Sequence, residues 1–205
     1  MDGERAPDAD VTLSDSPALP FSFRGAAYAS GVFYIAEWWN EHVHVFDRTG
    51  GRVPGREFGL AVADASSAGM AHDDGLFHVV DAYGLTAYAY AKSGTRVPRH
   101  DFALASGNGA PSGIARLDGA FYVADREDAR LYAYDSTGSR LPDRGFPLAP
   151  GNTRPRGIAV ADRRFHVVDG AGRVYVYEAD AGRHVPEAGF VFADDSVGVE
   201  AWRDH

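Results

Sequence analysis

The sequence of 205 residues contains no cysteine, which excludes disulfide bonds, thiolate metal sites and cysteine nucleophiles. It also has no apolar run near the roughly 20 residues that a membrane-spanning helix needs, so we expect no membrane span. Basic residues are few, with 20 Lys and Arg against 29 Asp and Glu and a net charge of −9. Because phosphate contacts need clustered cationic side chains, this balance argues against a nucleic-acid partner.

The first ten residues, MDGERAPDAD, have neither the basic nor the apolar region of a secretory signal peptide. The compartment therefore stays unknown, and an extracytoplasmic or cell-surface location is expected if the chain is part of a larger protein. Hydrophobic residues make up 45% of the chain and charged residues 24%, as in ordinary folded proteins and unlike disordered ones.

Glycine, proline and phenylalanine, in contrast, recur at a fixed step. The phrases Gly69-Met-Ala, Gly113-Ile-Ala and Gly157-Ile-Ala follow one another at 44 residues (113 − 69 and 157 − 113), and Gly25-Ala-Ala precedes them at the same step. Repeats of this length are typical of stacked supersecondary units. The same step separates the members of three further rows: Phe33, Phe77, Phe121 and Phe165; Pro54, Pro98, Pro142 and Pro186; Phe58, Phe102, Phe146 and Phe190.

Each unit reads as four short strands. In the third unit these are the segment that opens at Gly113, residues 121–125, residues 131–134 and residues 146–148, with an Asp118-Gly119 hairpin signal between the first two. No segment keeps an apolar period of 3.6 residues, so we expect no long helix. A β-helix would use shorter repeats, and a sandwich would not hold this register. The pattern predicts an all-β chain, a β-propeller of four-stranded antiparallel blades.

We expect one propeller domain over residues 1–205, or a fragment of one. The two terminal segments would supply strands to a composite, incomplete fifth blade. The alternatives are a chain cut from a larger propeller and two chains that associate to complete a ring. The expected units are the partial blade 1–24, the complete blades 25–68, 69–112, 113–156 and 157–197, which start 44 residues apart, and the partial blade 198–205.

Two stretches carry a resemblance to a known family. One is Pro155-Arg-Gly-Ile-Ala-Val followed by Phe165-His-Val-Val-Asp169; the other is Phe33-Tyr-Ile-Ala-Glu37 followed by Asn40-Glu-His-Val-His-Val-Phe-Asp47-Arg-Thr-Gly50. Both resemble NHL repeats, which open on Pro-x-Gly-Ile-Ala and end one strand in Asp. Glu37 and a longer connection before the fourth strand depart from that pattern. The resemblance implies a propeller, usually six-bladed, in a family that spans protein-binding and RNA-binding modules, sensors and a few lyases, so it does not choose a function.

A carboxylate follows the second strand of every unit. We interpret this row as turn caps, because Asp accepts backbone N–H groups, with an added pairing to His42, Arg130 or Arg173. The alternative is a ring of metal-binding or general-base groups. The row consists of Glu37, Asp81, Asp125 and Asp169.

Candidate ligand-binding residues lie where the repeat varies. The fourth position of the innermost strands carries Tyr28, His72 and Arg116, which would suit an anion or a small polar ligand in the channel. The loops at one end of the blades carry exposed aromatic and basic residues, which suit carbohydrate or protein contacts. The loop residues are Trp38, Trp39, Tyr83, Arg126 and Arg154.

We interpret the recurring histidine and asparagine residues as parts of the blade structure and not as ligands. His78 and His166 stand where other units carry tyrosine, which indicates a packing position. Asn108 and Asn152 follow glycine and are expected as left-handed turn residues. His42-x-His44 alone offers too few ligands, so we predict no metal residues and no cofactor, with a calcium or other divalent cation in the channel left open.

The leading hypothesis is a non-catalytic propeller that presents its loop face to a protein or glycan ligand, with no catalytic residues. One alternative is a lactonase-like or lyase-like enzyme with a metal in the channel, which needs at least three carboxylate, Asn or His groups at the channel mouth. The other is a structural repeat segment of a larger surface protein.

Overall fold

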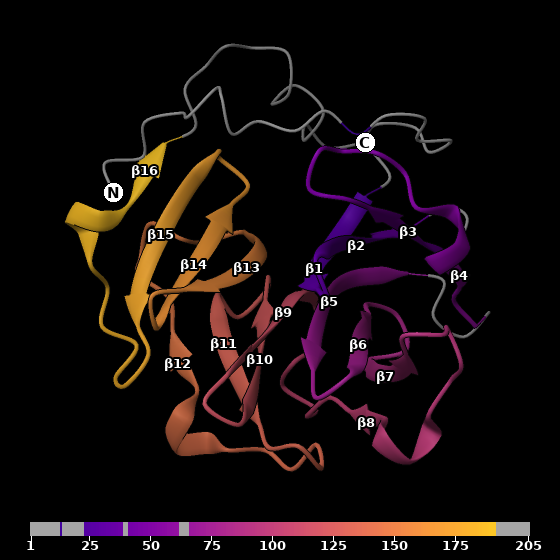
Figure 1. Ribbon diagram of the computed structural model, residues 1–205. Helices are drawn as coiled ribbons and strands as arrows, with labels where there is room; N and C mark the ends of the chain where they lie inside the picture. The colour runs from indigo at the N-terminus through magenta and orange to yellow at the C-terminus, as the bar shows by residue number, and fades with distance from the viewer. Residues whose placement is uncertain (1–12, 14–22, 39–40, 62–65, 192–205) are drawn as a thin grey trace.

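The computed structural model describes residues 13, 23–38, 41–61 and 66–191. They form four four-stranded antiparallel sheets arranged as the blades of a β-propeller, which confirms the predicted fold (Figure 1). Most of the predicted partial unit 1–24 and all of 198–205 lie outside the described residues. Within the described residues, no helix has the length and apolarity to cross a membrane.

Successive strands pair in chain order within each blade. The innermost strand of each blade begins at residue 23, 67, 111 or 155, two residues before the glycine that opens each predicted unit. The blades comprise β1 Phe23–Ala29, β2 Val32–Glu37, β3 His42–Phe46 and β4 Phe58–Gly59; β5 Ser67–Asp73, β6 Leu76–Asp81, β7 Thr86–Ala91 and β8 Phe102–Ala103; β9 Pro111–Leu117, β10 Ala120–Asp125, β11 Arg130–Tyr134 and β12 Phe146–Pro147; β13 Pro155–Ala161, β14 Arg164–Asp169, β15 Arg173–Glu178 and β16 Phe190–Val191.

The turns explain the recurring polar and proline residues. Asp118 and Gly119 have φ angles of 46° and 75°, the pair of positive values that a tight hairpin turn needs, so this hairpin prediction is confirmed. Each recurring proline opens a one-turn 3-10 helix before the short outer strand, an element that the sequence pattern did not predict. These helices are η2 Pro54–Arg56, η4 Pro98–His100, η5 Pro142–Arg144 and η6 Pro186–Ala188.

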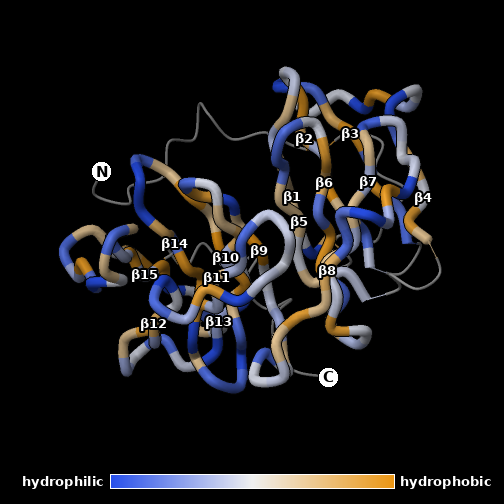
Figure 2. The backbone as a smooth tube through the Cα atoms, turned by 90° about the horizontal axis from the view of Figure 1, so that it is seen from below, coloured by the Kyte–Doolittle hydropathy of each residue, from blue (hydrophilic) through white to orange (hydrophobic). Residues whose placement is uncertain are grey.

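The core lies between blades, where one blade presents a row of apolar side chains to the next. Figure 2 shows the hydrophobic residues along the strands and hydrophilic residues at many connecting turns. At each interface a ring from one blade packs on a phenylalanine of the next, and His78 takes a position that tyrosine holds elsewhere, as predicted. The ring centroids are 4.3 Å apart for Tyr34 and Phe77, 4.4 Å for His78 and Phe121, and 4.5 Å for Tyr122 and Phe165.

The innermost strands approach one another closely through glycine. A Cβ atom on Gly25 would lie 2.7 Å from the Cα of Gly69, and one on Gly69 would lie 2.8 Å from the Cα of Gly113. A Cβ on Gly113 would lie 3.1 Å from the Cα of Gly157. The glycine row therefore exists because the strands around the axis leave no room for a side chain.

Buried amide and phenol groups link the third and fourth blades to the loops before them. The Tyr134 hydroxyl accepts hydrogen bonds from the N–H of Ala105 at 3.0 Å and from Asn108 Nδ2 at 3.1 Å. Tyr177 repeats these contacts with the next loop. Asn108 is fully buried, and neither it nor Asn152 has a positive φ. The prediction of left-handed turn residues was therefore wrong, because these asparagines are held by side-chain hydrogen bonds.

Candidate ligand-binding site

The carboxylates that follow the second strands hold the loops at one end of the propeller. Asp125 is fully buried and accepts hydrogen bonds from the backbone N–H groups of Ala110 at 2.9 Å, Glu127 at 2.8 Å and Asp128 at 2.8 Å. Its carboxylate thus joins the loop that enters β9 to the turn that leaves β10. Asp169 makes the equivalent bonds in the last blade. The turn-cap interpretation is confirmed for these two residues.

The first two blades vary this cap. Asp81 accepts hydrogen bonds from the Ser66 hydroxyl and from the N–H of Tyr83, the latter at 2.9 Å. Glu37 instead has its carboxylate 2.8 Å from His44 Nε2, although His42 is its cross-strand neighbour. Glu37 also interacts electrostatically with His42, so the predicted pairing is accompanied by this closer contact with His44.

A cavity of about 350 Å³ opens among these loops, at the end of the propeller where the innermost strands begin. All four blades contribute to it. Arg24, Ala68, Ser112 and Arg156 are the second residues of the four innermost strands, and the turns after β2, β6 and β10 complete the wall. The remaining lining residues are Trp38, Ser66, Ser67, Ala82, Tyr83, Gly109, Ala110, Pro111, Arg126 and Glu127.

Three arginines give this cavity its charge. Burial lowers the pKa of Arg24, and the positive charges of Arg156 and Arg126 lower it further. The guanidinium of Arg24 also lies 5.2 Å from the centre of the Trp38 ring. Glu127 is the one carboxylate among the described lining residues. The cavity therefore concentrates positive charge and aromatic surface in a chain whose net charge is −9.

Some of the predicted loop residues meet at the cavity. Trp38, Tyr83 and Arg126 line it, and Tyr83 is 82% exposed. The backbone N–H of Arg126 donates to the carbonyl of Ala110, which fixes the base of its side chain. Arg154 lies in the loop before β13 and is not among the lining residues, whereas Trp39 lies outside the described part of the chain.

The predicted channel residues lie farther along the innermost strands, toward the hairpin turns. Tyr28 is 49% exposed and packs on Phe33, and His72 lies 5.1 Å from the Phe77 ring. Arg116 forms an ion pair with Asp73 at 2.9 Å and lies over an aromatic ring. The structure does not bring these three residues to the cavity.

Neither Arg24 nor Arg156 was selected from the sequence as a candidate ligand-binding residue. Both belong to the row of second positions on the innermost strands, which varies between arginine, alanine and serine. The variation in that row was the available signal. The fourth position of the same strands varies as well, and the sequence alone does not tell which of the two rows lines a cavity.

Comparison with known proteins finds likeness in structure only. No family model matches, and no curated protein matches. Among solved structures, the chain is similar to a streptogramin B lyase, with 13% identity, a TM-score of 0.59 and coverage of 86% of this chain and 57% of the lyase. A virginiamycin B lyase from Staphylococcus aureus gives 15% identity, a TM-score of 0.59 and coverage of 87% and 58%. A glutaminyl cyclase from Myxococcus xanthus gives 11% identity, a TM-score of 0.64 and coverage of 80% of this chain and 68% of the cyclase.

These likenesses support the class defined by the fold, a β-propeller. The chain spans less than three fifths of the two lyase structures. Identity at this level carries the fold and no particular activity. The NHL resemblance stays a prediction, since no family model matches.

Proposed function

We propose that this propeller is a binding module whose loop-end cavity takes an anionic group of a protein or glycan ligand. The observation that carries the proposal is the meeting of Arg24, Arg126 and Arg156 at one cavity, with Glu127 as the single carboxylate among the described lining residues. Guanidinium groups bind carboxylates through paired, geometrically matched hydrogen bonds, which makes arginine well suited to such recognition.

The electrostatics support an anion in this place. The pKa of Arg24 is lowered partly by the charges of Arg156 and Arg126, so the three cations repel one another. An anion among them would relieve that repulsion, because it interacts favourably with all three. The rest of the chain is acidic, so this local reversal of sign favours an anionic ligand at the cavity over its surroundings.

The size and surface of the cavity suit a small part of a larger ligand. Its volume of about 350 Å³ lies at the low end of the range for small-molecule sites. Trp38 and the exposed Tyr83 offer flat apolar faces beside the cations, which suit a sugar ring or an aromatic or aliphatic side chain.

The enzyme alternative finds less support at this place. It needs at least three carboxylate, Asn or His groups at the channel mouth, and the described lining residues offer Glu127 alone. The alternative of a structural segment without a ligand predicts no binding at all. Both hypotheses can be separated from the proposal in one assay.

The test is a binding screen of the full chain on an array of acidic and neutral glycans and of acidic and neutral peptides. We expect an acidic ligand to bind, with an affinity that falls as ionic strength rises. Arg126→Ala should weaken binding at least about tenfold, about 1.4 kcal/mol. Arg99→Ala, which removes an exposed arginine of η4 away from the cavity, is the matched control. Equal binding by the two variants, or binding of neutral ligands only, would refute the proposal.

A further inference from the structure

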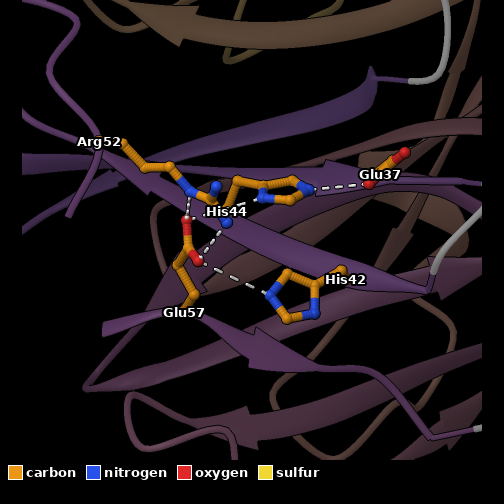
Figure 3. A network of polar contacts seen from close by, with 5 residues as sticks. All are labelled: Glu37, His42, His44, Arg52 and Glu57. Carbon is orange, nitrogen blue, oxygen red and sulfur yellow. Dashed lines mark hydrogen bonds and ion pairs between the residues drawn. The ribbon is translucent and has the colours of Figure 1, made fainter. Parts of the chain in front are cut away.

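A second polar cluster lies on the first blade, apart from the cavity (Figure 3). His42 and His44 are two residues apart on β3 and therefore share one face of the blade. Glu57 precedes β4, and β4 pairs with β3 so that Gly59 is opposite His42 and Phe58 is opposite Val43. The β3–η2–β4 connection thus brings three side chains with ligating atoms to one place.

The ligating atoms are close together. His44 Nδ1 lies 3.6 Å from Glu57 Oε1, and His42 Nε2 lies 4.0 Å from Glu57 Oε2. All three groups offer atoms within 4.8 Å of one another. Ligands of a tetrahedral zinc ion at about 2.0–2.1 Å are separated by roughly 3.3 Å, so small rotations of these side chains suffice.

His44 is oriented as a metal ligand would be. Its side chain is 3% exposed, and Nε2 lies 2.8 Å from a carboxylate oxygen of Glu37. An ionised carboxylate only accepts hydrogen bonds, so the proton belongs on Nε2. Nδ1 then carries a lone pair, and no hydrogen bond satisfies it. A carboxylate behind the imidazole of a ligating histidine is the arrangement that fixes its tautomer in metal sites.

This combination does not belong to the repeat. At the position of His44 the later blades carry Tyr88, Tyr132 and Tyr175, and at the position of Glu57 they carry Asp101, Gly145 and Gly189. In the third and fourth blades the tyrosine contacts a loop instead, since the hydroxyls of Tyr132 and Tyr175 donate to the carbonyls of Gly107 and Gly151, both at 2.7 Å. Blade construction therefore does not account for the histidines of the first blade.

We propose that His42, His44 and Glu57 form a binding site for a divalent transition-metal ion of the zinc type, with Glu37 as the positioning residue for His44. Two imidazoles and one carboxylate suit zinc and its neighbours, whereas calcium and magnesium prefer all-oxygen sites. Arg52 hydrogen-bonds both oxygens of Glu57, at 2.6 and 2.7 Å, which holds the carboxylate toward the histidines. The positive charge of Arg52 also repels a metal ion, so the affinity of the site for zinc should be lower than that of a closed four-ligand zinc site.

The test is calorimetric titration of the untagged, chelator-treated full chain with Zn²⁺. We expect one ion per chain. His42→Ala should weaken binding at least about tenfold, and because the His42 side chain is one-third exposed (33%) this variant should fold. His100→Ala, which removes a histidine of η4 outside the cluster, is the matched control and should bind as the unchanged chain does.

Two further measurements keep the proposal open to refutation. Co²⁺ in the same site should give visible absorption bands that His42→Ala abolishes and His100→Ala retains. Glu37→Gln should weaken Zn²⁺ binding roughly tenfold while the stoichiometry stays at one, as loss of an orienting carboxylate does. Absence of stoichiometric binding, or equal titrations of His42→Ala and His100→Ala, would overturn the proposal.

Discussion

The glycine row on the innermost strands allows the same substitution, glycine to alanine, to be compared at two positions, Gly69 and Gly157. A Cβ added to Gly69 would lie 2.8 Å from the Cα of Gly113 and 2.9 Å from the backbone nitrogen of Ile114. Neither atom can move without shifting a strand, so Gly69→Ala overpacks the axis. Overpacking of this kind costs about 1–3 kcal/mol. Gly157 is the last glycine of this row, and an added Cβ there meets no described atom within 4 Å.

Gly157→Ala should therefore leave stability unchanged or raise it slightly, by up to about 1 kcal/mol, because alanine restricts the unfolded chain. For a domain of this size 1 kcal/mol shifts the melting temperature by roughly 2–4 °C. At a cost of about 2 kcal/mol, Gly69→Ala should lower it by roughly 4–8 °C. Thermal and urea unfolding followed by circular dichroism measure both variants. Equal losses, or no loss in Gly69→Ala, would contradict the argument that backbone contact excludes a side chain.

Further predictions concern buried polar groups and assembly. Burial lowers the pKa of His78 from 6.5 to about 4. The neutral His78 therefore stabilises the folded state fully above pH 6.5, the pKa of the unfolded chain, and this free energy is lost as the pH falls toward 4. The free energy of unfolding should fall by about 2 kcal/mol between pH 7 and pH 5. His78→Tyr, which installs the residue of the first and third blades, should remove this dependence on pH when unfolding is measured in urea. Tyr134→Phe strands the donors of Ala105 and Asn108 and should cost about 1–3 kcal/mol, and Tyr177→Phe should cost a similar amount; unaltered urea midpoints would count against these bonds. Ring completion by two chains stays a prediction, and light scattering after size exclusion tests it through a dimer mass.

The repeat made the fold predictable. A step of 44 residues (113 − 69), read together with the Asp-Gly turns, determines how many strands each unit has and in which order they pair. The caps followed from the same reasoning, because a buried aspartate after a strand has backbone N–H groups within reach. The 3-10 turns at the proline row were missed, since periodicity does not report a single turn of helix.

The site was predicted only in part, and the reason is three-dimensional. Trp38, Tyr83 and Arg126 interrupt the repeat and were therefore visible in the sequence. Arg24 lies within a strand that reads as structural, and its role depends on four strands meeting at one level around the axis. Glu57 is likewise separated from His44 by η2, and only the pairing of β3 with β4 brings the two together.

The aspartate caps have a consequence for how this surface changes over evolutionary time. Asp125 and Asp169 hold the loops through backbone N–H groups, so the hold does not depend on which side chains the loops carry. Substitutions at Arg126 therefore change a side chain that lines the cavity while the path of its loop is retained. Selection can therefore exchange the side chains around the cavity without rebuilding the loops that carry them.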